Sequence, residues 1–212
     1  MPCIKVSFDN AIKNLTCIQP KLIFLTGKSG TGKSYFSSKL KDNFVPLEVD
    51  LIVRKLAKKH NIGIAPDYNK AFQVYKGKSP IFFENEFIKE IHKFIDKNNN
   101  KSIIIDAAIS NSELIKKIFS GKYKIFTFVF LYPNSINRYS NRIMKRYIKD
   151  VTTKKKTLPF WSEVPKEIED ASLKSKKVKK FIKDMAKKQK KKSDERYKYF
   201  SSNGFSIYTV LV

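Results

Sequence analysis

The chain has 212 residues, 42% of them apolar, so it is long enough to bury a core and too apolar to be disordered throughout. Its two cysteines and two histidines form no C-x-x-C motif or Cys/His cluster, which argues against a disulfide framework or structural zinc site and favours a reducing, cytoplasmic compartment. The formal net charge of +25 favours polyanionic partners such as nucleic acid, an acidic membrane or phosphorylated metabolites.

The first predicted strand, at residues 21–26, is followed by a predicted helix at 34–43. Between them the pattern G-x-x-x-x-G-K-[ST] is met by Gly27-Lys28-Ser29-Gly30-Thr31-Gly32-Lys33-Ser34. The glycines let backbone N–H groups turn inward around an anion, and the helix start adds its positive dipole end. Lys33 would reach the β- and γ-phosphates of ATP, and the Ser34 hydroxyl would bind Mg²⁺. We also place Tyr35 in this nucleotide site.

This segment resembles the Walker A motif of P-loop NTPases, and its form G-x-S-G-x-G-K-S is similar to that of small kinases such as uridine and guanylate kinases. ABC transporter ATPases share the form, but the chain lacks the L-S-G-G-Q signature of that class. The resemblance implies a three-layer α/β fold with a mainly parallel sheet, a helical lid and a kinase activity. It also implies that residues 1–212 form a single kinase domain.

A second strand is predicted at residues 44–49, where Pro46 favours either an edge position in the sheet or a later start of the strand, and a helix is predicted at residues 50–60. Asp50 lies at their junction, with Arg54 one helical turn later. A carboxylate there could orient or deprotonate a phosphoryl acceptor, and Arg54 could hold a phosphate of that substrate. Alternatively, Asp50 only caps the helix. Glu48 is a weaker candidate for the same role.

The stretch "DLIVRKL" resembles the D-x-I-x-R-x-L pattern of dephospho-CoA kinases, in which the aspartate is the catalytic base. Uridine kinases and polynucleotide kinases also carry a functional aspartate near this position. Such kinases place their acceptor site in the region that corresponds to residues 61–100, which includes a predicted amphipathic helix at 82–97. Tyr75 is our candidate acceptor contact in this region, with Tyr68 and Lys78 as further candidates.

The hydrophobic run at 101–106 predicts a buried strand that ends in Asp106, and residues 111–119 predict a helix. Hydrophobic residues followed by an aspartate form the Walker B pattern, in which the acid holds Mg²⁺ or its water shell. Many buried strands end in an acid without this role. Because the chain also has a phosphate-binding loop, we predict Asp106 as a metal ligand together with Ser34.

Residues 123–132 predict the strongest strand, and their apolar run is too short to span a membrane. In the predicted helix at 134–150, Arg138, Arg142 and Arg146 recur every four residues and form one stripe. The position resembles the lid of nucleotide kinases, here about 134–165, which implies that Arg142 and Arg146 contact the transferring phosphoryl group. Arg138 would approach the adenine or pair with an acid. The alternative is a solvated basic face.

A basic helix is predicted at 166–200, and a closing strand at 205–212. From Lys174 to Lys192, 11 of 19 residues are lysine, although apolar residues still recur at helical spacing. This helix is either a solvated charged element or a surface for nucleic acid or an acidic partner. Strands and helices alternate along the chain, which predicts a parallel sheet whose carboxyl edge brings together Gly27, Asp50 and Asp106.

These observations predict an ATP- and Mg²⁺-dependent kinase that phosphorylates a small nucleoside- or nucleotide-like acceptor. The alternatives are a dephospho-CoA kinase, a polynucleotide 5′-kinase or other nucleic-acid enzyme, and a non-catalytic NTP-binding module.

Overall fold

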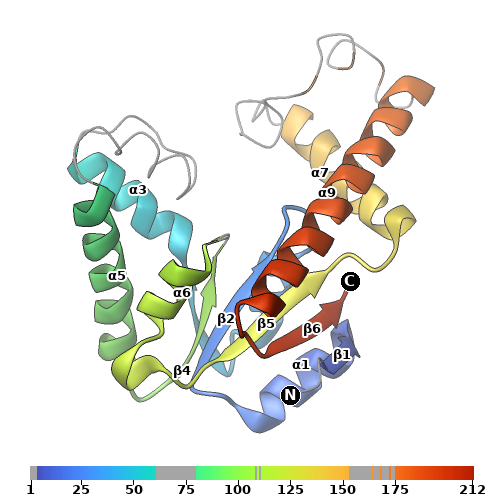
Figure 1. Cartoon of the computed structure of the whole chain (residues 1–212). Helices are drawn as coiled ribbons and strands as arrows, with labels where there is room; N and C mark the ends of the chain where they lie inside the picture. The colour runs from blue at the N-terminus through green and yellow to red at the C-terminus, as the bar shows by residue number, and fades with distance from the viewer. Residues whose placement is uncertain are drawn as a thin grey trace.

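A six-stranded parallel sheet forms the centre of the computed structural model, which describes residues 4–60, 80–107, 109, 111–152, 164, 168, 172 and 175–212 (Figure 1). The strand order is β1-β6-β5-β2-β4-β3, and every described pairing is parallel. The strands are β1 Ile4–Ser7, β2 Leu22–Gly27, β3 Phe44–Glu48, β4 Ser102–Asp106, β5 Thr127–Tyr132 and β6 Ile207–Leu211.

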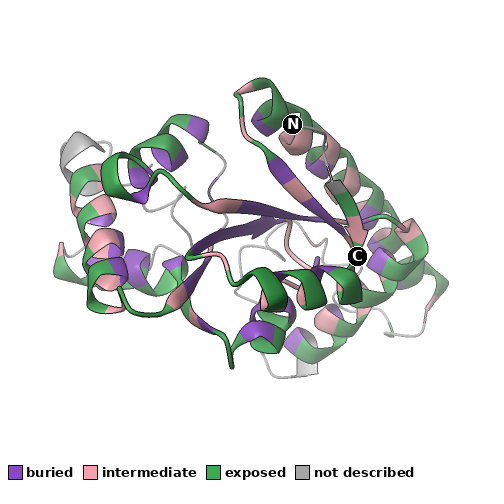
Figure 2. Ribbon diagram, turned by 90° about the horizontal axis from the view of Figure 1, so that it is seen from below, coloured by how far each residue is buried: buried purple, intermediate pink, exposed green. Residues whose placement is uncertain are grey.

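Helices cover both faces of this sheet, which gives the predicted three-layer α/β architecture (Figures 1 and 2). One face packs against α3 (Val49–Lys59), α5 (Pro80–Lys97), α6 (Ser112–Ile118) and the end of α9 (Lys176–Ser202). The other face packs against α1 (Phe8–Ile18) and α2 (Lys33–Leu40). A short 3₁₀ helix, η1, spans Gly121–Tyr123. Within the described part of the chain, no helix combines the length and apolar character needed to cross a membrane.

Strand β2 shows why a parallel sheet suits this sequence. All of its residues are buried, and successive side chains enter opposite layers: Phe24 packs in the layer of α3, α5 and α6, whereas Ile23 and Leu25 pack in the layer of α1 and α2. Strands buried on both faces read as continuous apolar runs. The edge position predicted from Pro46 is confirmed, because β3 pairs only with β4 among the described strands and no neighbour needs its missing N–H.

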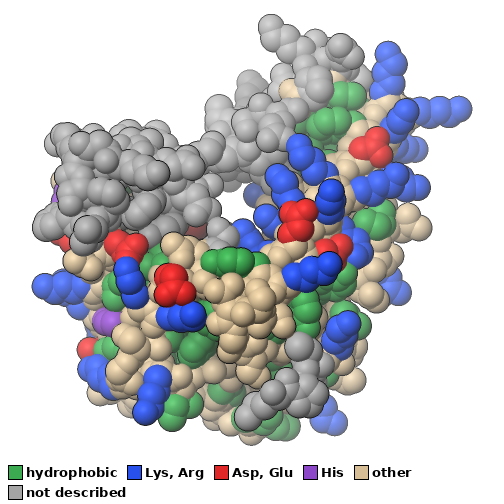
Figure 3. All heavy atoms as spheres, viewed as in Figure 1, with side chains coloured by type: hydrophobic (Ala, Val, Ile, Leu, Met, Phe, Trp, Pro, Cys, Tyr) green, Lys and Arg blue, Asp and Glu red, His purple; other side chains and the backbone are tan. Residues whose placement is uncertain are grey.

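Helix α7 (Ile136–Thr152) and α9 form a separate layer of their own at the carboxyl end of the sheet (Figure 1). Their contact buries Tyr139, Ile143 and Tyr147 of α7 against Val178 and Ile182 of α9. The basic helix is therefore anchored by an apolar face, as its spacing predicted. Its lysines lie on the remaining surface, and Figure 3 shows basic side chains gathered along α9.

The structure adds three elements and shifts several boundaries. None of β1, α1 and η1 was predicted. Strand β5 begins at Thr127 rather than at 123, where η1 ends, and α9 begins at Lys176. Helix α7 continues to Thr152. The proposed contacts Tyr68, Tyr75 and Lys78 lie outside the described residues, as does much of the predicted lid beyond 152.

Candidate active site

The segment between β2 and α2 forms a tight loop that only glycine can build at two positions. The backbone φ is +157° at Gly27 and +92° at Gly32. A Cβ atom on Gly27 would lie 2.8 Å from Thr31 Oγ1 and 3.0 Å from the Leu131 carbonyl oxygen, so no side chain fits there. Gly32 is the N-cap of α2 and provides no capping side chain, which leaves the first N–H groups of that helix open to an anion.

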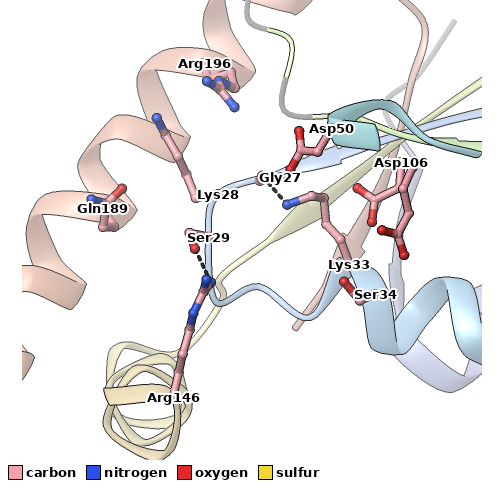
Figure 4. Close-up of a pocket in the computed structure, with 11 residues that line it drawn as sticks. Gly27, Lys28, Ser29, Lys33, Ser34, Asp50, Asp106, Arg146, Gln189 and Arg196 are labelled. Carbon is pink, nitrogen blue, oxygen red and sulfur yellow. Dashed lines mark hydrogen bonds between the residues drawn. The ribbon is translucent and has the colours of Figure 1, made fainter. Parts of the chain in front are cut away.

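Lys33 begins α2, and its side chain folds back over the loop (Figure 4). Its Nζ donates a hydrogen bond of 3.2 Å to the Gly27 carbonyl oxygen. Burial lowers the pKa of Lys33, while the nearby carboxylates of Asp106 and Asp50 favour its charged form. The ammonium thus lies among loop amides and opposite two acids, where a bound phosphate would meet it. Ser34 follows in the first turn of α2 and lines the same cavity.

Three carboxylates meet at the carboxyl ends of β3 and β4. Glu48 and Asp106 are partners in the strand register, and Asp50 lies two residues beyond Glu48. Burial raises the pKa of Asp106 to about 6; Lys33 opposes this rise, and Asp50 and Glu48 add to it. Helix α3 begins at Val49 with Glu48 as its N-cap, so Asp50 lies inside the first turn and is not the cap.

Ser34 and Asp106 fit the requirements of a magnesium ion that is held mainly by phosphate and water. Both are hard oxygen ligands, and both line the cavity. The half-buried Asp106 carboxylate makes no hydrogen bond or ion pair with any described residue, so its oxygens face the cavity without a protein partner. No three His, Cys, Asp or Glu side chains among the described residues form a metal cage. Mg²⁺ needs few protein ligands when a nucleotide supplies the others.

Helix α7 holds the loop from the outside through three side chains on one face. The hydroxyl of Tyr139, which is 1% exposed, donates a hydrogen bond of 2.7 Å to the Ser29 carbonyl oxygen. Arg142 Nη1 donates to the Thr31 carbonyl oxygen at 3.4 Å, and Arg146 Nη1 donates to Ser29 Oγ. The predicted arginine stripe therefore reaches the loop through Arg142 and Arg146.

Two cavities border the loop. The first, of about 400 Å³, is bounded by the loop, the three carboxylates, Arg146 and two residues of α9, Gln189 and Arg196 (Figure 4). The second, of about 760 Å³, is bounded by the loop, the start of α1, Tyr35, Arg142 and Arg146. Both cavities are bordered by the same four residues, Ser29, Lys33, Ser34 and Arg146. A phosphate chain that passes between a donor site and an acceptor site would require such shared residues.

Tyr35 borders the larger cavity as an exposed aromatic ring. It is 58% exposed and stacks on Phe8 with ring centroids 5.5 Å apart. A flat, solvent-facing ring next to a phosphate-binding loop is a surface on which a nucleotide base can stack. Tyr35 therefore lines the larger cavity next to the loop, and its role in binding a nucleotide stays a prediction.

The structure brings most of the predicted site residues together and places two of them, Arg54 and Arg138, away from the cavities. One or both cavities are lined by the residues of the loop from Gly27 to Ser34 and by Tyr35, Asp50, Asp106, Arg142 and Arg146. Arg54 and Arg138 are exposed and line neither. Tyr75 lies outside the described residues.

Sequence analysis missed Gln189 and Arg196. Arg196 is one of only five arginines, and the other basic residues of its helix are all lysines. This contrast was the only feature of the sequence that could have indicated a functional role for Arg196.

No protein-family model matches the chain, and no curated protein matches it. Among solved structures, the chain is similar to an unliganded sugar kinase from Janibacter sp., at 15% sequence identity and a TM-score of 0.40. The similarity covers 60% of this chain and 68% of that one. At this TM-score we infer nothing about function from the likeness, and the geometry of the site alone supports the proposal below.

Proposed function

We propose that the chain is an ATP-dependent kinase that transfers the γ-phosphoryl group to a hydroxyl or phosphate of a nucleoside- or nucleotide-like acceptor. The observation that carries this proposal is the meeting of Lys33 and Asp50 in one cavity, close enough for the carboxylate to influence the Lys33 ammonium. A phosphate-binding cation and a candidate base at the same edge of the sheet are the two groups that phosphoryl transfer needs in one place.

The residues of the loop divide the work of holding the donor. The backbone N–H groups from Gly27 to Ser34 would bind the β- and γ-phosphates, and Lys33 would neutralise charge on the oxygen that bridges them. Ser34 and Asp106 would hold Mg²⁺, which supplies further charge neutralisation when bound. Tyr35 offers a stacking surface for the base.

Transfer then requires an acceptor oxygen in line with the γ-phosphorus. Asp50 would accept the proton of an acceptor hydroxyl as its oxygen bonds to phosphorus, while the bond from phosphorus to the β-γ bridging oxygen breaks and ADP leaves. Arg142 and Arg146 reach the loop from α7 and would contact equatorial oxygens of the transferring group. Positioning and charge neutralisation are the main contributions a protein makes to this reaction.

A polynucleotide 5′-kinase is the second candidate, because the basic helix α9 borders the cavity through Gln189 and Arg196. The dephospho-CoA kinase alternative gains no such support, since Arg54 of its pattern does not line the cavity. A deletion of residues 174–192, the most basic part of α9, would not distinguish a polynucleotide kinase from a small-molecule kinase. It would delete Val178, Ile182 and Ala186, which are fully buried against α7, and so disrupt the fold.

The decisive experiment measures ADP release with a panel of nucleosides, nucleotides, dephospho-CoA and 5′-hydroxyl oligonucleotides. We expect acceptor-dependent turnover that Lys33→Ala abolishes. Lys116→Ala, which removes an exposed lysine of α6 that pairs with Glu113, is the matched control and should retain full activity. Absence of ATP binding in the unmodified chain, or equal turnover with Lys33→Ala, would refute the kinase proposal.

A further inference from the structure

Two basic side chains face each other across the smaller cavity. Lys28 extends from the loop toward α9, where Arg196 and Gln189 project into the same space (Figure 4). Gln189 and Arg196 are seven residues apart and therefore lie on one face of the helix. Lys28 and Arg196 thus reach the same cavity from two different elements, the loop and α9.

Neither cation is neutralised. Within the described residues, the side chains of Lys28 and Arg196 make no hydrogen bond and no ion pair. Other basic residues do find partners: Lys190 of the same helix contacts the Tyr132 hydroxyl and Asp194, and Lys55 pairs with Glu90. Half-buried charges without partners are unfavourable in a folded protein, so an unpaired pair facing a cavity indicates a site for an anion.

The electrostatics of Lys28 agree with this interpretation. Burial, together with the positive charges of Arg196 and Lys192, lowers the pKa of Lys28 to about 8, and Glu195 opposes this shift only in part. Burial also lowers the pKa of Arg196. The surroundings therefore do not supply enough negative charge to balance Lys28 and Arg196, and a bound dianion would supply it.

We infer that Lys28 and Arg196 form a subsite for a phosphate that the acceptor already carries, so that the acceptor is a phosphate ester rather than an unphosphorylated nucleoside or sugar. This inference rests on the proposed function. The loop amides and Lys33 suffice for the donor phosphates, whereas Lys28 points away from them toward α9. Asp50 lines the same cavity, so an acceptor anchored there by its phosphate would place a hydroxyl near the candidate base.

Arginine provides the selectivity of such a subsite. Its planar fork matches two phosphate oxygens, and the Gln189 amide can donate a further hydrogen bond. The subsite would accept a nucleoside 3′-monophosphate, which carries a dianionic phosphate, or the first phosphodiester of a strand with a 5′-hydroxyl end, which carries one negative charge fewer. Both place a phosphate ester close to the reacting hydroxyl.

The first test measures binding without turnover. Protein saturated with magnesium and a non-hydrolysable ATP analogue is titrated with inorganic phosphate by calorimetry. We expect binding that Arg196→Met weakens about ten- to a hundredfold, since a hydrogen bond to a charged group contributes about 1.5–3 kcal/mol. Lys191→Met, which removes an exposed charge from the same helix, should bind phosphate as the unmodified protein does. Equal binding by Arg196→Met, or no phosphate binding at all, would overturn the inference.

The second test compares acceptors that differ by one phosphate. Adenosine is compared with adenosine 3′-monophosphate, and a 5′-hydroxyl oligonucleotide shows whether a strand end is used instead of a mononucleotide. We expect Arg196→Met to reduce the preference for the phosphorylated acceptor by at least about tenfold, with Arg196→Lys intermediate. An equal loss of kcat on both acceptors would mean that Arg196 contacts the transferring group, and the inference would fail.

The design separates this inference from the kinase proposal. If the ATP analogue does not bind but phosphate still binds through Arg196, the kinase proposal fails and the anion subsite stands. Thermal unfolding without ligand checks that Arg196→Met folds. Because the removed charge has no described partner, its melting temperature should equal or exceed that of the unmodified protein.

Discussion

Tyr139 of α7 donates a hydrogen bond to the backbone carbonyl oxygen of Ser29, and this contact fixes α7 to the loop at 27–34, where we propose that phosphate binds. The ring is buried beside Gly30, where an added Cβ would lie 3.4 Å from it. One residue thus sets both the shape of the loop and the position of Arg142 and Arg146, which lie on the same helix face.

Tyr139→Phe should therefore weaken ATP binding several-fold as well as destabilise the fold by about 1 kcal/mol, the usual contribution of one hydrogen bond. Calorimetric titration with ATP and thermal unfolding measure the two effects. Tyr123→Phe is the control, because Tyr123 donates to Asp96 at 2.8 Å and lines neither cavity. It should lose stability alone. If both variants keep full ATP affinity, the contact has no role in shaping the loop.

Gly27→Ala should abolish nucleotide binding, because its Cβ would overlap Thr31 Oγ1 and the Leu131 backbone. Gly204→Ala provides the comparison. Its φ is +83°, but no atom lies within 4 Å of an added Cβ, so it carries the backbone strain of about 1 kcal/mol without a clash. Fluorescence titration with a labelled ATP analogue should show loss of binding only for Gly27→Ala. Comparable binding by the two variants would contradict the assigned loop geometry.

Asp106 should make the ligand-free protein less stable as the pH rises. Its pKa is about 6 in the fold against 3.8 for the free side chain, so the fold favours the protonated form. The stability it contributes is fully present below pH 4 and is lost as the pH rises through 6. Asp106→Asn should therefore be more stable than the unmodified protein at pH 8, by about 3 kcal/mol, and equal to it near pH 4.

The same group should also set an acid limit on activity. Below about pH 6 the protonated Asp106 cannot act as a metal ligand, so kcat/KM for ATP with magnesium should fall as the pH decreases through that value. Magnesium titrations at pH 5.5 and 7.5 test the point directly. A magnesium affinity that is independent of pH over this range would exclude Asp106 from the metal site.

Asp50→Asn should reduce kcat by about 10²–10⁴-fold and leave ATP affinity almost unchanged, as expected for loss of a general base. Glu48→Gln removes a carboxylate from the same cavity, at the position that pairs with Asp106, and should cost far less. Single-turnover measurements with saturating ATP distinguish the two. Equal losses would assign the role to the acidic cluster as a whole, and no loss in Asp50→Asn would favour the non-catalytic NTP-binding module.

The parts of the site that could be predicted are those that local sequence encodes. The loop from Gly27 to Ser34 is one continuous motif, and Asp106 follows a buried apolar run whose strand ends where predicted. The spacing of Arg138, Arg142 and Arg146 predicted a stripe, but not which members would reach the loop. That depends on how Tyr139 docks, and Arg138 remains on the exposed side.

The parts that could not be predicted depend on contacts distant in sequence. Arg196 enters the cavity because α9 crosses the sheet end after packing on α7, and no local pattern encodes that crossing. Strand β1 has only four residues and is completed by β6, about two hundred residues later, so it lacks a strong signal of its own. The magnitude of the charge was evident from composition, whereas the half-buried, unpaired state of Lys28 was not.

The central position of β2 in the sheet has a consequence for folding during synthesis on the ribosome. Leu25 pairs with Asp106 on one edge and with Val129 on the other, so β2 can gain its first neighbour only after residue 106 has been synthesised and its second only after residue 129. At roughly 5–20 residues per second, both edges of this apolar strand stay unpaired for about 4–16 seconds, and one edge stays unpaired for about 5–20 seconds. Slow translation between β2 and β5 should make the nascent chain depend on chaperones more than its length of 212 residues suggests.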